Sequence, residues 1–434
     1  MAKEKSQISF LERMDLDVIE KDWLPPEVFP DLRNSEYISV DLETSDPNLT
    51  TLGPGWARGD GFIVGVAIAA GDFIGYYPIA HEGGGNIPLK KVMSWLADQL
   101  ATPKIPKIMH NATYDAGWLR WAGVKIQGTI IDTMVAAPLI DENRFSYSLN
   151  NLGRDYINMR KDERTLRAAA NDHGFDPKGE MWRLNSRFVG AYAEKDAEIT
   201  LKLWQRFKTE IEVQSLMTVF DLETALIPVM LDMREKGVKV NINQAEQTKT
   251  KLIARKKELV AEIKRDTGVQ VEPWVAKSVA KVFDYHNLHY NNTEGNGQPS
   301  FTKAFLQAHP HEVAAKILRL REFHQLRSDD GGTVTGRFSS SNPNLQQIPA
   351  RDPEIKAMIR GLFVPDDDCK WGSFDYSSQE PRLLVHYCAS LNEEDRHPAI
   401  DDVVAEYHKG DADFHQMVAD MANITRKHVR YGCG

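Results

Sequence analysis

The sequence has few cysteines: only Cys369, Cys388 and Cys433 in 434 residues. Because they are widely spaced and odd in number, a disulfide framework and a zinc site are not expected, and a reducing interior is favoured. The first 15 residues, MAKEKSQISFLERMD, lack the apolar core of a signal peptide. The most apolar window, residues 62–80, is interrupted by Asp72 and by glycines, so it predicts strands and no membrane span.

A positive net charge is also missing, since the formal charge at pH 7 is −9. This balance does not point to nucleic acid, but net charge averages over domains, and catalytic sites made of carboxylates make it more negative. The composition, 42% hydrophobic and 26% charged, is that of an ordinary globular protein. The length predicts two to three domains of ~100–200 residues.

Short β-rich runs alternate with turn signals over residues 37–80, and helical patterns follow at 89–101 and 192–207. Strands that give way to helices within about 200 residues predict an α/β domain. From about Leu216 to Arg265 the pattern becomes helical and charged, and residues 245–266 hold seven Lys/Arg against four Asp/Glu. A solvated helix face and a DNA-facing helix both fit this excess. Residues 291–300 predict a turn-rich surface loop.

Carboxylates occur at places where a metal site can form. Asp41 and Glu43 end the run YISVDLE, and residues i and i+2 of a strand share one face. In HNATYDAGWL, Asp115 follows Asn111 by four residues, one helical turn. Each pattern alone is also typical of capping or surface acids, so the case depends on the ordered set.

A third pair completes the set, because Tyr192 and Asp196 lie one turn apart in GAYAEKDAEITLKLW. Four carboxylates and a tyrosine in this order can build two neighbouring Mg²⁺ sites. Such a pair of ions suits phosphodiester hydrolysis, in which the tyrosine would orient the attacking water. The block from about residue 30 to 210 resembles the 3′–5′ exonuclease domain of the DEDD superfamily in its tyrosine-bearing form. The resemblance implies a ribonuclease H-like fold and two Mg²⁺ ions, with Mn²⁺ as a substitute.

Three later motifs resemble family A DNA polymerases of the bacterial DNA polymerase I and phage type. They are TGRFSSSNPNLQQIP (335–349), GLFVP (361–365) and DYSSQEPRLLVHY (375–387), in the order and with the short spacings of the family. In DYSSQEPRLLVHY, Asp375 is expected at the end of a strand, just before a helix that carries Leu383, Leu384 and Tyr387 on one face. The resemblance implies that Asp375 holds the polymerase metal ions and that Glu380 excludes a ribose 2′-hydroxyl.

The resemblance also implies DNA and nucleotide contacts. Arg337 and the region of Asn344 and Gln346 would contact primer–template DNA along the minor groove. His415 and Arg426 would bind the incoming triphosphate, although a solvated surface role fits each of them alone.

The late His-Asp-Glu motif of the family is missing, and the lysine expected one turn beyond Arg426 is Arg430. We therefore expect the fingers and the second half of the palm to be absent, so that dNTPs bind only with the missing part. A split-polymerase subunit completed by a second polypeptide and a truncated reading frame both fit.

The sequence thus predicts an α/β protein: a ribonuclease H-like 3′–5′ exonuclease domain (1–213), a thumb-like helical region (214–330) and a partial palm (331–434). It would bind primer–template DNA and single-stranded 3′ ends, without a membrane partner, in the cytoplasm of a host cell if phage-encoded. Two alternatives stay open: a stand-alone exoribonuclease resembling ribonuclease D, and a DNA-binding remnant without chemistry.

Overall fold

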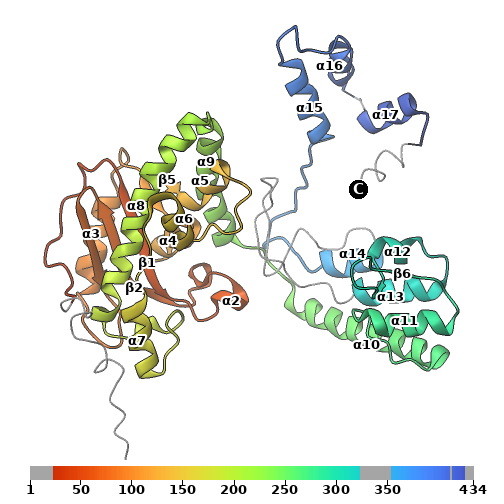
Figure 1. The fold of residues 1–434 in the computed structure, drawn as a ribbon, viewed down its shortest axis with the longest axis horizontal. Coiled ribbons are helices and arrows are strands. Elements are labelled where there is room, and N and C mark those ends of the chain that lie inside the picture. The colour runs from red at the N-terminus through yellow and green to blue at the C-terminus, as the bar shows by residue number, and fades with distance from the viewer. Residues whose placement is uncertain (1–22, 323–352, 411–412, 426–434) are drawn as a thin grey trace, which may run out of the picture. The chain divides into compact units, whose positions relative to one another are not determined.

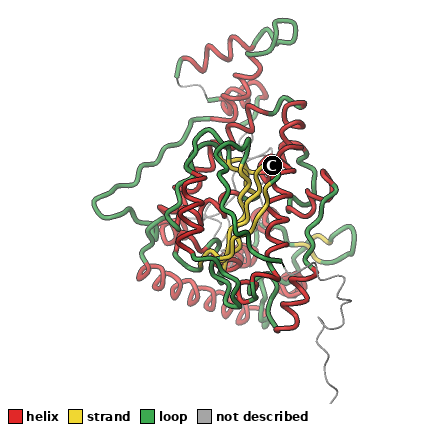
Figure 2. The backbone as a smooth tube through the Cα atoms, turned by 90° about the vertical axis from the view of Figure 1, so that its left-hand side faces the viewer, coloured by secondary structure: helices red, strands yellow, loops and turns green. Residues whose placement is uncertain are grey.

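The computed structural model describes residues 23–322, 353–410 and 413–425. The chain forms two compact units, Met1–Phe363 and Val364–Gly434. The first unit contains a five-stranded mixed sheet, drawn in Figures 1 and 2. No helix in the described part of the chain is both long enough and apolar enough to cross a membrane.

The sheet has the strand order β3-β2-β1-β4-β5. β1 pairs antiparallel with β2, and β2 with β3, whereas β1–β4 and β4–β5 are parallel. The three strands expected within residues 37–80 are confirmed, and the mixed sheet is of the ribonuclease H-like type. The strands are β1 (Ile38–Ser45), β2 (Phe62–Ala70), β3 (Phe73–Pro78), β4 (Lys107–Met109) and β5 (Ile130–Asp132).

Helices cover both faces of this sheet, because side chains of β2 alternate between two cores, with Val66 in one and Ala67 in the other. Val40 and Leu42 face the core built with α3 (Leu89–Leu100) and α4 (Ala112–Trp121). α8 (Gly190–Val213) contacts β1, β2 and β3 and contributes to a second core; it runs across the sheet in Figure 1. Further α-helices described in this part are α2 (Leu49–Leu52), α5 (Thr133–Ile140), α6 (Leu149–Ile157) and α7 (Arg164–His173).

The helical segment expected at 216–265 is confirmed as α9 (Met217–Lys236) and α10 (Ile242–Thr267). α9 adds Phe220, Ile227 and Leu231 to the two cores around the sheet. A third core joins α10 to the helices that follow it. These helices are α11 (Ala276–Tyr285), α12 (Lys303–Ala308) and α13 (Glu312–Glu322), with α14 (Pro353–Arg360) later in the unit.

The turn-rich segment at 291–300 contains a short hairpin of β6 (Asn291–Asn292) and β7 (Pro299–Ser300). The domain boundaries drawn from the sequence at 213/214 and 330/331 stay predictions. The second of them lies outside the described residues.

The second unit contains α15 (Gln379–Ala389), α16 (Ile400–His408) and α17 (Phe414–Ala422). The helix expected after Asp375 is confirmed as α15, and it leaves Leu383, Leu384 and Tyr387 exposed. The prediction of a strand before Asp375 is wrong, because residues 371–376 form no strand. A strand needs hydrogen-bonded neighbours, and none of the described residues pairs with this segment.

Candidate active site

Three carboxylates meet between the central strand and the helix that crosses it. Ligand oxygens of Asp41, Glu43 and Asp196 all lie within 4.8 Å of one another. Asp41 and Glu43 share one face of β1, and α8 brings Asp196 to that face. Among the described residues, no other group of three or more His, Cys, Asp or Glu side chains is placed to hold a metal ion.

Small residues on β2 leave room beside these acids. Ala67 lies opposite Asp41, and Gly65 lies opposite Glu43. A Cβ atom at Gly65 would stand 2.1 Å from the hydroxyl of Tyr76, so only glycine lets that ring lie here. The position of Tyr76 is also fixed by His81, whose Nε2 lies 2.8 Å from the tyrosine hydroxyl.

The hydrogen bonds of His81 determine which group donates. Its Nδ1 lies 3.0 Å from the carbonyl of Leu184, which can only accept, so Nδ1 carries the proton. Nε2 of the neutral ring is then an acceptor, and Tyr76 donates to it. Burial lowers the pKa of His81 to about 4, which keeps the ring neutral at physiological pH.

The carboxylate cluster is electrostatically unfavourable without a cation. Glu43 and Asp196 are buried, and Asp41 is half-buried. Burial and then the charge of Asp196 raise the pKa of Asp41. Burial, followed by Asp41 and Asp196, raises the pKa of Glu43. Buried acids in such proximity are stabilised by a bound cation or by protons.

Asp115, the fourth predicted carboxylate, is buried next to this cluster but is not part of it. Its Oδ1 accepts a hydrogen bond from the backbone N–H of Leu42, between the two acids of β1, at 3.0 Å. Burial and the charge of Asp41 raise the pKa of Asp115. The expected helical turn between Asn111 and Asp115 is wrong in detail, because Asn111 precedes α4 with a left-handed φ of 67°.

Asp132 holds the start of α4 in place, and no pattern in the sequence singles it out. Its carboxylate accepts from the backbone N–H groups of Asn111 at 2.9 Å, Ala112 at 2.7 Å and Met134 at 2.8 Å. It therefore caps α5 and anchors α4 at the same time. The first turn of α4 carries Asp115, so Asp132 fixes part of the site.

Tyr192 lies one turn before Asp196 on α8, as predicted from the spacing. Burial and the neighbouring charge of Asp196 raise its pKa well above the usual range. The side chain therefore stays a neutral hydroxyl at physiological pH. It can orient a water molecule by hydrogen bonding, and it cannot act as a base.

Lys161 also reaches the cluster, and sequence reasoning missed it. It lies in the segment between α6 and α7 and forms an ion pair with Asp196 Oδ2. Its Nζ lies 3.5 Å from the hydroxyl of Tyr192 and 5.2 Å from the centre of that ring. Burial opposes the charged form, but Asp196, Asp41 and Glu43 outweigh it and raise the pKa of Lys161. A lone lysine in a loop carries no periodic signal that would have selected it.

The donor set fits a hard divalent cation, because it consists of carboxylate oxygens. One oxygen is available in particular: Asp196 Oδ1 is buried and has no hydrogen-bond partner within the described part of the chain. Buried polar atoms without partners are rare and require an explanation. The cluster can therefore hold a metal ion at the Oδ1 side of Asp196.

Three of the predicted polymerase residues, Asp375, Glu380 and His415, lie in the described part of the second unit. Asp375 is exposed in an irregular segment, and Glu380 is exposed in the first turn of α15. His415 belongs to α17. Four predicted contacts lie outside the described residues: Arg337, Asn344, Gln346 and Arg426.

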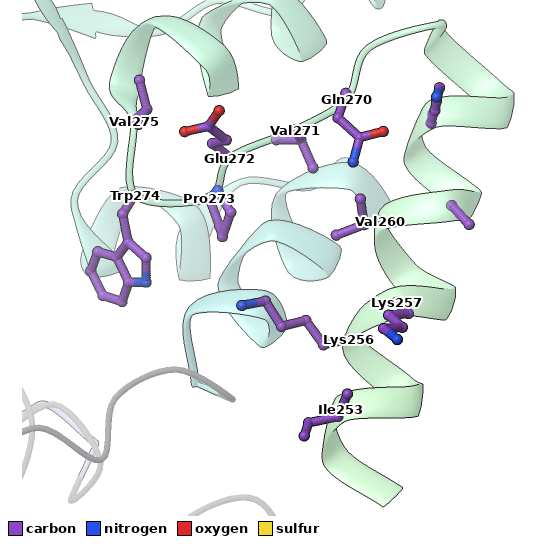
Figure 3. Close-up of a pocket in the computed structure, with 12 residues that line it drawn as sticks. Ile253, Lys256, Lys257, Val260, Gln270, Val271, Glu272, Pro273, Trp274 and Val275 are labelled. Carbon is purple, nitrogen blue, oxygen red and sulfur yellow. The ribbon is translucent and has the colours of Figure 1, made fainter. Parts of the chain in front are cut away.

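The basic segment of α10 lines an open groove of about 1140 Å³. Its walls are α10 and residues 270–275, as Figure 3 shows. Lys256, Lys257 and Lys264 line it together with apolar side chains such as Val260 and Trp274. The groove thus combines positive charge with an aromatic surface.

Comparison with known proteins agrees with both resemblances found in the sequence, the one to a 3′–5′ exonuclease domain and the one to family A DNA polymerases. A family model described as 3′–5′ exonuclease matches residues 17–212, and one described as DNA polymerase family A matches residues 329–430. A DNA-directed DNA polymerase of Pseudomonas phage M6 is 32% identical over 98% of this chain and 70% of that protein. The chain belongs to family A of the DNA polymerases.

Other relatives are similar over less of their length. DNA polymerase DpoZ of Acinetobacter phage SH-Ab 15497 is 29% identical over 93% of this chain and 69% of that protein. DNA polymerase I of Chloroflexus aurantiacus is 27% identical over 83% of this chain and 40% of that protein. The alternative of a ribonuclease D-like enzyme gains no support, because the polymerase similarity extends over almost the whole chain.

A solved structure has a similar fold. It is the POL domain of Pol1 from M. smegmatis in complex with DNA primer-template and dNTP, with a TM-score of 0.64 and 18% identity. The match covers 95% of this chain and 75% of that one. Family membership confirms the expectation of a polymerase chain with a 3′–5′ exonuclease domain.

Proposed function

We propose that this family A polymerase removes nucleotides from DNA 3′ ends at the site formed by Asp41, Glu43, Asp115 and Asp196. The observation that carries the proposal is the carboxylate cluster on β1 and α8, inside the segment that the exonuclease family model matches. The substrate would be the single-stranded 3′ end of a primer. If the protein is phage-encoded, this DNA would lie in the cytoplasm of a host cell.

The residues fit two Mg²⁺ ions, with Mn²⁺ as a substitute. When bound, such a pair of ions activates water for attack and offsets the charge that develops at phosphorus. The protein would supply the rest. Asp41, Glu43 and Asp196 would act as direct ligands, with Asp115 beside them, and the neutral hydroxyl of Tyr192 would orient the attacking water.

The test is digestion of single-stranded DNA labelled at its 3′-terminal nucleotide, with Mg²⁺ present. The double change Asp41→Ala, Glu43→Ala should lower the release of labelled mononucleotide by about a thousandfold or more, because metal ligands supply several kcal/mol of transition-state stabilisation. Asp72→Ala removes an exposed acid on the turn after β2 and serves as the control. Equal digestion by the double variant and the control would contradict the proposal.

A second activity, template-directed DNA synthesis, is favoured by the family match at residues 329–430. We propose that Asp375 is a ligand of the polymerase metal ions, that Glu380 discriminates against ribose, and that Arg337, Asn344, Gln346, His415 and Arg426 contact DNA or the incoming nucleotide. Two metal ions between primer and triphosphate need more than one carboxylate. The expectation that a second polypeptide supplies further elements stays a prediction.

Synthesis is tested by primer extension with a protein that carries Asp41→Ala and Glu43→Ala, so that degradation cannot mask it. Any extension should be lost on the further change Asp375→Ala. It should persist when the exposed Asp368 is changed to Ala instead. Extension that survives Asp375→Ala would refute the role of this carboxylate.

A further inference from the structure

Lys161 is a charged side chain at the candidate exonuclease site to which the proposed reaction gives no role. Its charge acts on Asp41, Glu43 and Asp196 together. The side chain is largely buried, with 15% of its surface exposed. A lysine buried to this extent costs free energy unless its ammonium group is paired, so its position at the cluster is specific.

The backbone around Lys161 is held by α6. The N–H of Lys161 donates to the side-chain oxygen of Asn150 at 3.1 Å. Two residues earlier, the N–H of Met159 donates to the carbonyl of Gly153 at 2.9 Å. The ammonium group is thus directed at the carboxylates by a segment whose backbone is anchored to α6 at Met159 and at Lys161.

The two oxygens of Asp196 have different surroundings, and Lys161 explains the difference. Lys161 takes Oδ2, and Oδ1 is buried without a hydrogen-bond partner among the described residues. An ammonium bound to Oδ2 fixes the plane of the carboxylate and leaves Oδ1 for a metal ion. The same ammonium lies 3.5 Å from the Tyr192 hydroxyl, so one cation contacts both residues.

We propose that Lys161 is a positioning residue of the exonuclease site, which orients Asp196 and Tyr192 and at the same time weakens the metal affinity of the cluster by its charge. The proposal rests on the proposed exonuclease function for its catalytic part. The weakening of metal affinity follows from electrostatics alone, because a divalent cation among these carboxylates must bind next to an ammonium group.

The two effects of removing the charge have opposite signs, which separates this role from a structural one. Lys161→Met should bind Mn²⁺ on the order of tenfold more tightly, because the neighbouring positive charge is gone. Its rate of DNA digestion at saturating Mn²⁺ should fall on the order of tenfold or more, because Asp196 and Tyr192 lose their common anchor. A lysine that merely supports the fold would, when removed, weaken metal binding and activity together.

The experiment measures Mn²⁺ binding by titration calorimetry and single-turnover digestion of 3′-labelled single-stranded DNA, both on the full chain. Lys161→Arg keeps the charge, so its Mn²⁺ affinity should stay within about twofold of the wild type. Lys195→Met is the matched control, because Lys195 is a lysine on α8 that pairs with Glu198. It should behave as the wild type in both assays.

The proposal is overturned if Lys161→Met binds Mn²⁺ no more tightly than the wild type, or if it digests DNA at the wild-type rate when saturated with metal. Circular dichroism checks that the variant folds, and Lys161→Gln provides a second neutral variant if it does not. A wild-type chain that binds Mn²⁺ and digests no DNA would refute the exonuclease function itself. The calorimetric comparison would still decide the effect of the lysine charge.

Discussion

Replacement of Asp132 by alanine should destabilise the exonuclease domain more than any ordinary capping change. Its carboxylate is buried and accepts three backbone hydrogen bonds, from Asn111, Ala112 and Met134. Hydrogen bonds to a charged group contribute about 1.5–3 kcal/mol each, and the cost of burying the charge offsets part of their sum. We expect Asp132→Ala to lower the free energy of unfolding by about 3–5 kcal/mol.

The isosteric change Asp132→Asn separates the acceptor atoms. Oδ1 accepts from Asn111 and Met134, whereas Oδ2 accepts from Ala112. The side-chain oxygen of asparagine can keep the first two hydrogen bonds. Its NH₂ group then faces the N–H of Ala112, and because both groups are donors they cannot form a hydrogen bond. One bond is lost and one buried donor is left unpaired, so the loss should be about 1–3 kcal/mol.

Urea denaturation of the full chain, followed by tryptophan fluorescence, measures both losses. The slope with denaturant should not change, because the compactness of the native state is kept. Asp176→Ala is the control, because Asp176 accepts a backbone hydrogen bond from Gly179 at an exposed site, and it should cost less than about 1 kcal/mol. A loss below about 1 kcal/mol for Asp132→Ala, or equal losses for alanine and asparagine, would refute the reasoning.

Two further predictions concern other charged groups. Lys107 is fully buried with its ammonium donating to two carbonyls, and burial lowers its pKa to about 8 from an ordinary 10.5. Between pH 8 and 10.5 the unfolded chain therefore binds more protons than the folded chain. The free energy of unfolding of the wild type, relative to that of Lys107→Met, should rise by about 2–3 kcal/mol from pH 7.5 to 10. A difference between the two proteins that does not depend on pH would contradict this prediction. Lys256 and Lys257 line the groove on α10. If they contact phosphates, changing both to Ala should flatten the salt dependence of primer–template binding, measured by fluorescence anisotropy. Binding of the wild-type chain that does not respond to salt would contradict this prediction.

The strands, the long helices and the carboxylate set could be predicted because they depend on local spacing. The alternation of YISVDLE fixes one face for Asp41 and Glu43, and the pitch of α8 places Tyr192 one turn from Asp196. Such relations hold wherever the strand or helix forms. The order of the elements then brought the two halves of the site together.

Features that depend on tertiary contacts could not be predicted in this way. Asp132 caps α5 and also anchors the start of α4 because β4 and β5 lie side by side, and nothing local to the residue indicates that. Lys161 reaches the cluster from a loop that lacks any period. The strand expected before Asp375 failed because pairing partners, and not β propensity alone, decide whether a strand forms.

The carboxylate cluster lowers the stability of the fold. Carboxylates on the inner face of β1 occupy positions that apolar side chains would fill at lower free energy, and burial raises the pKa of Glu43. The cores on both faces of the sheet offset that cost. Because a cation that binds only the folded protein stabilises it by mass action, metal loading and folding of this domain should be linked. Lys161 supplies part of that cation charge permanently, which lets the site fold before metal is bound and limits how tightly metal binds afterwards.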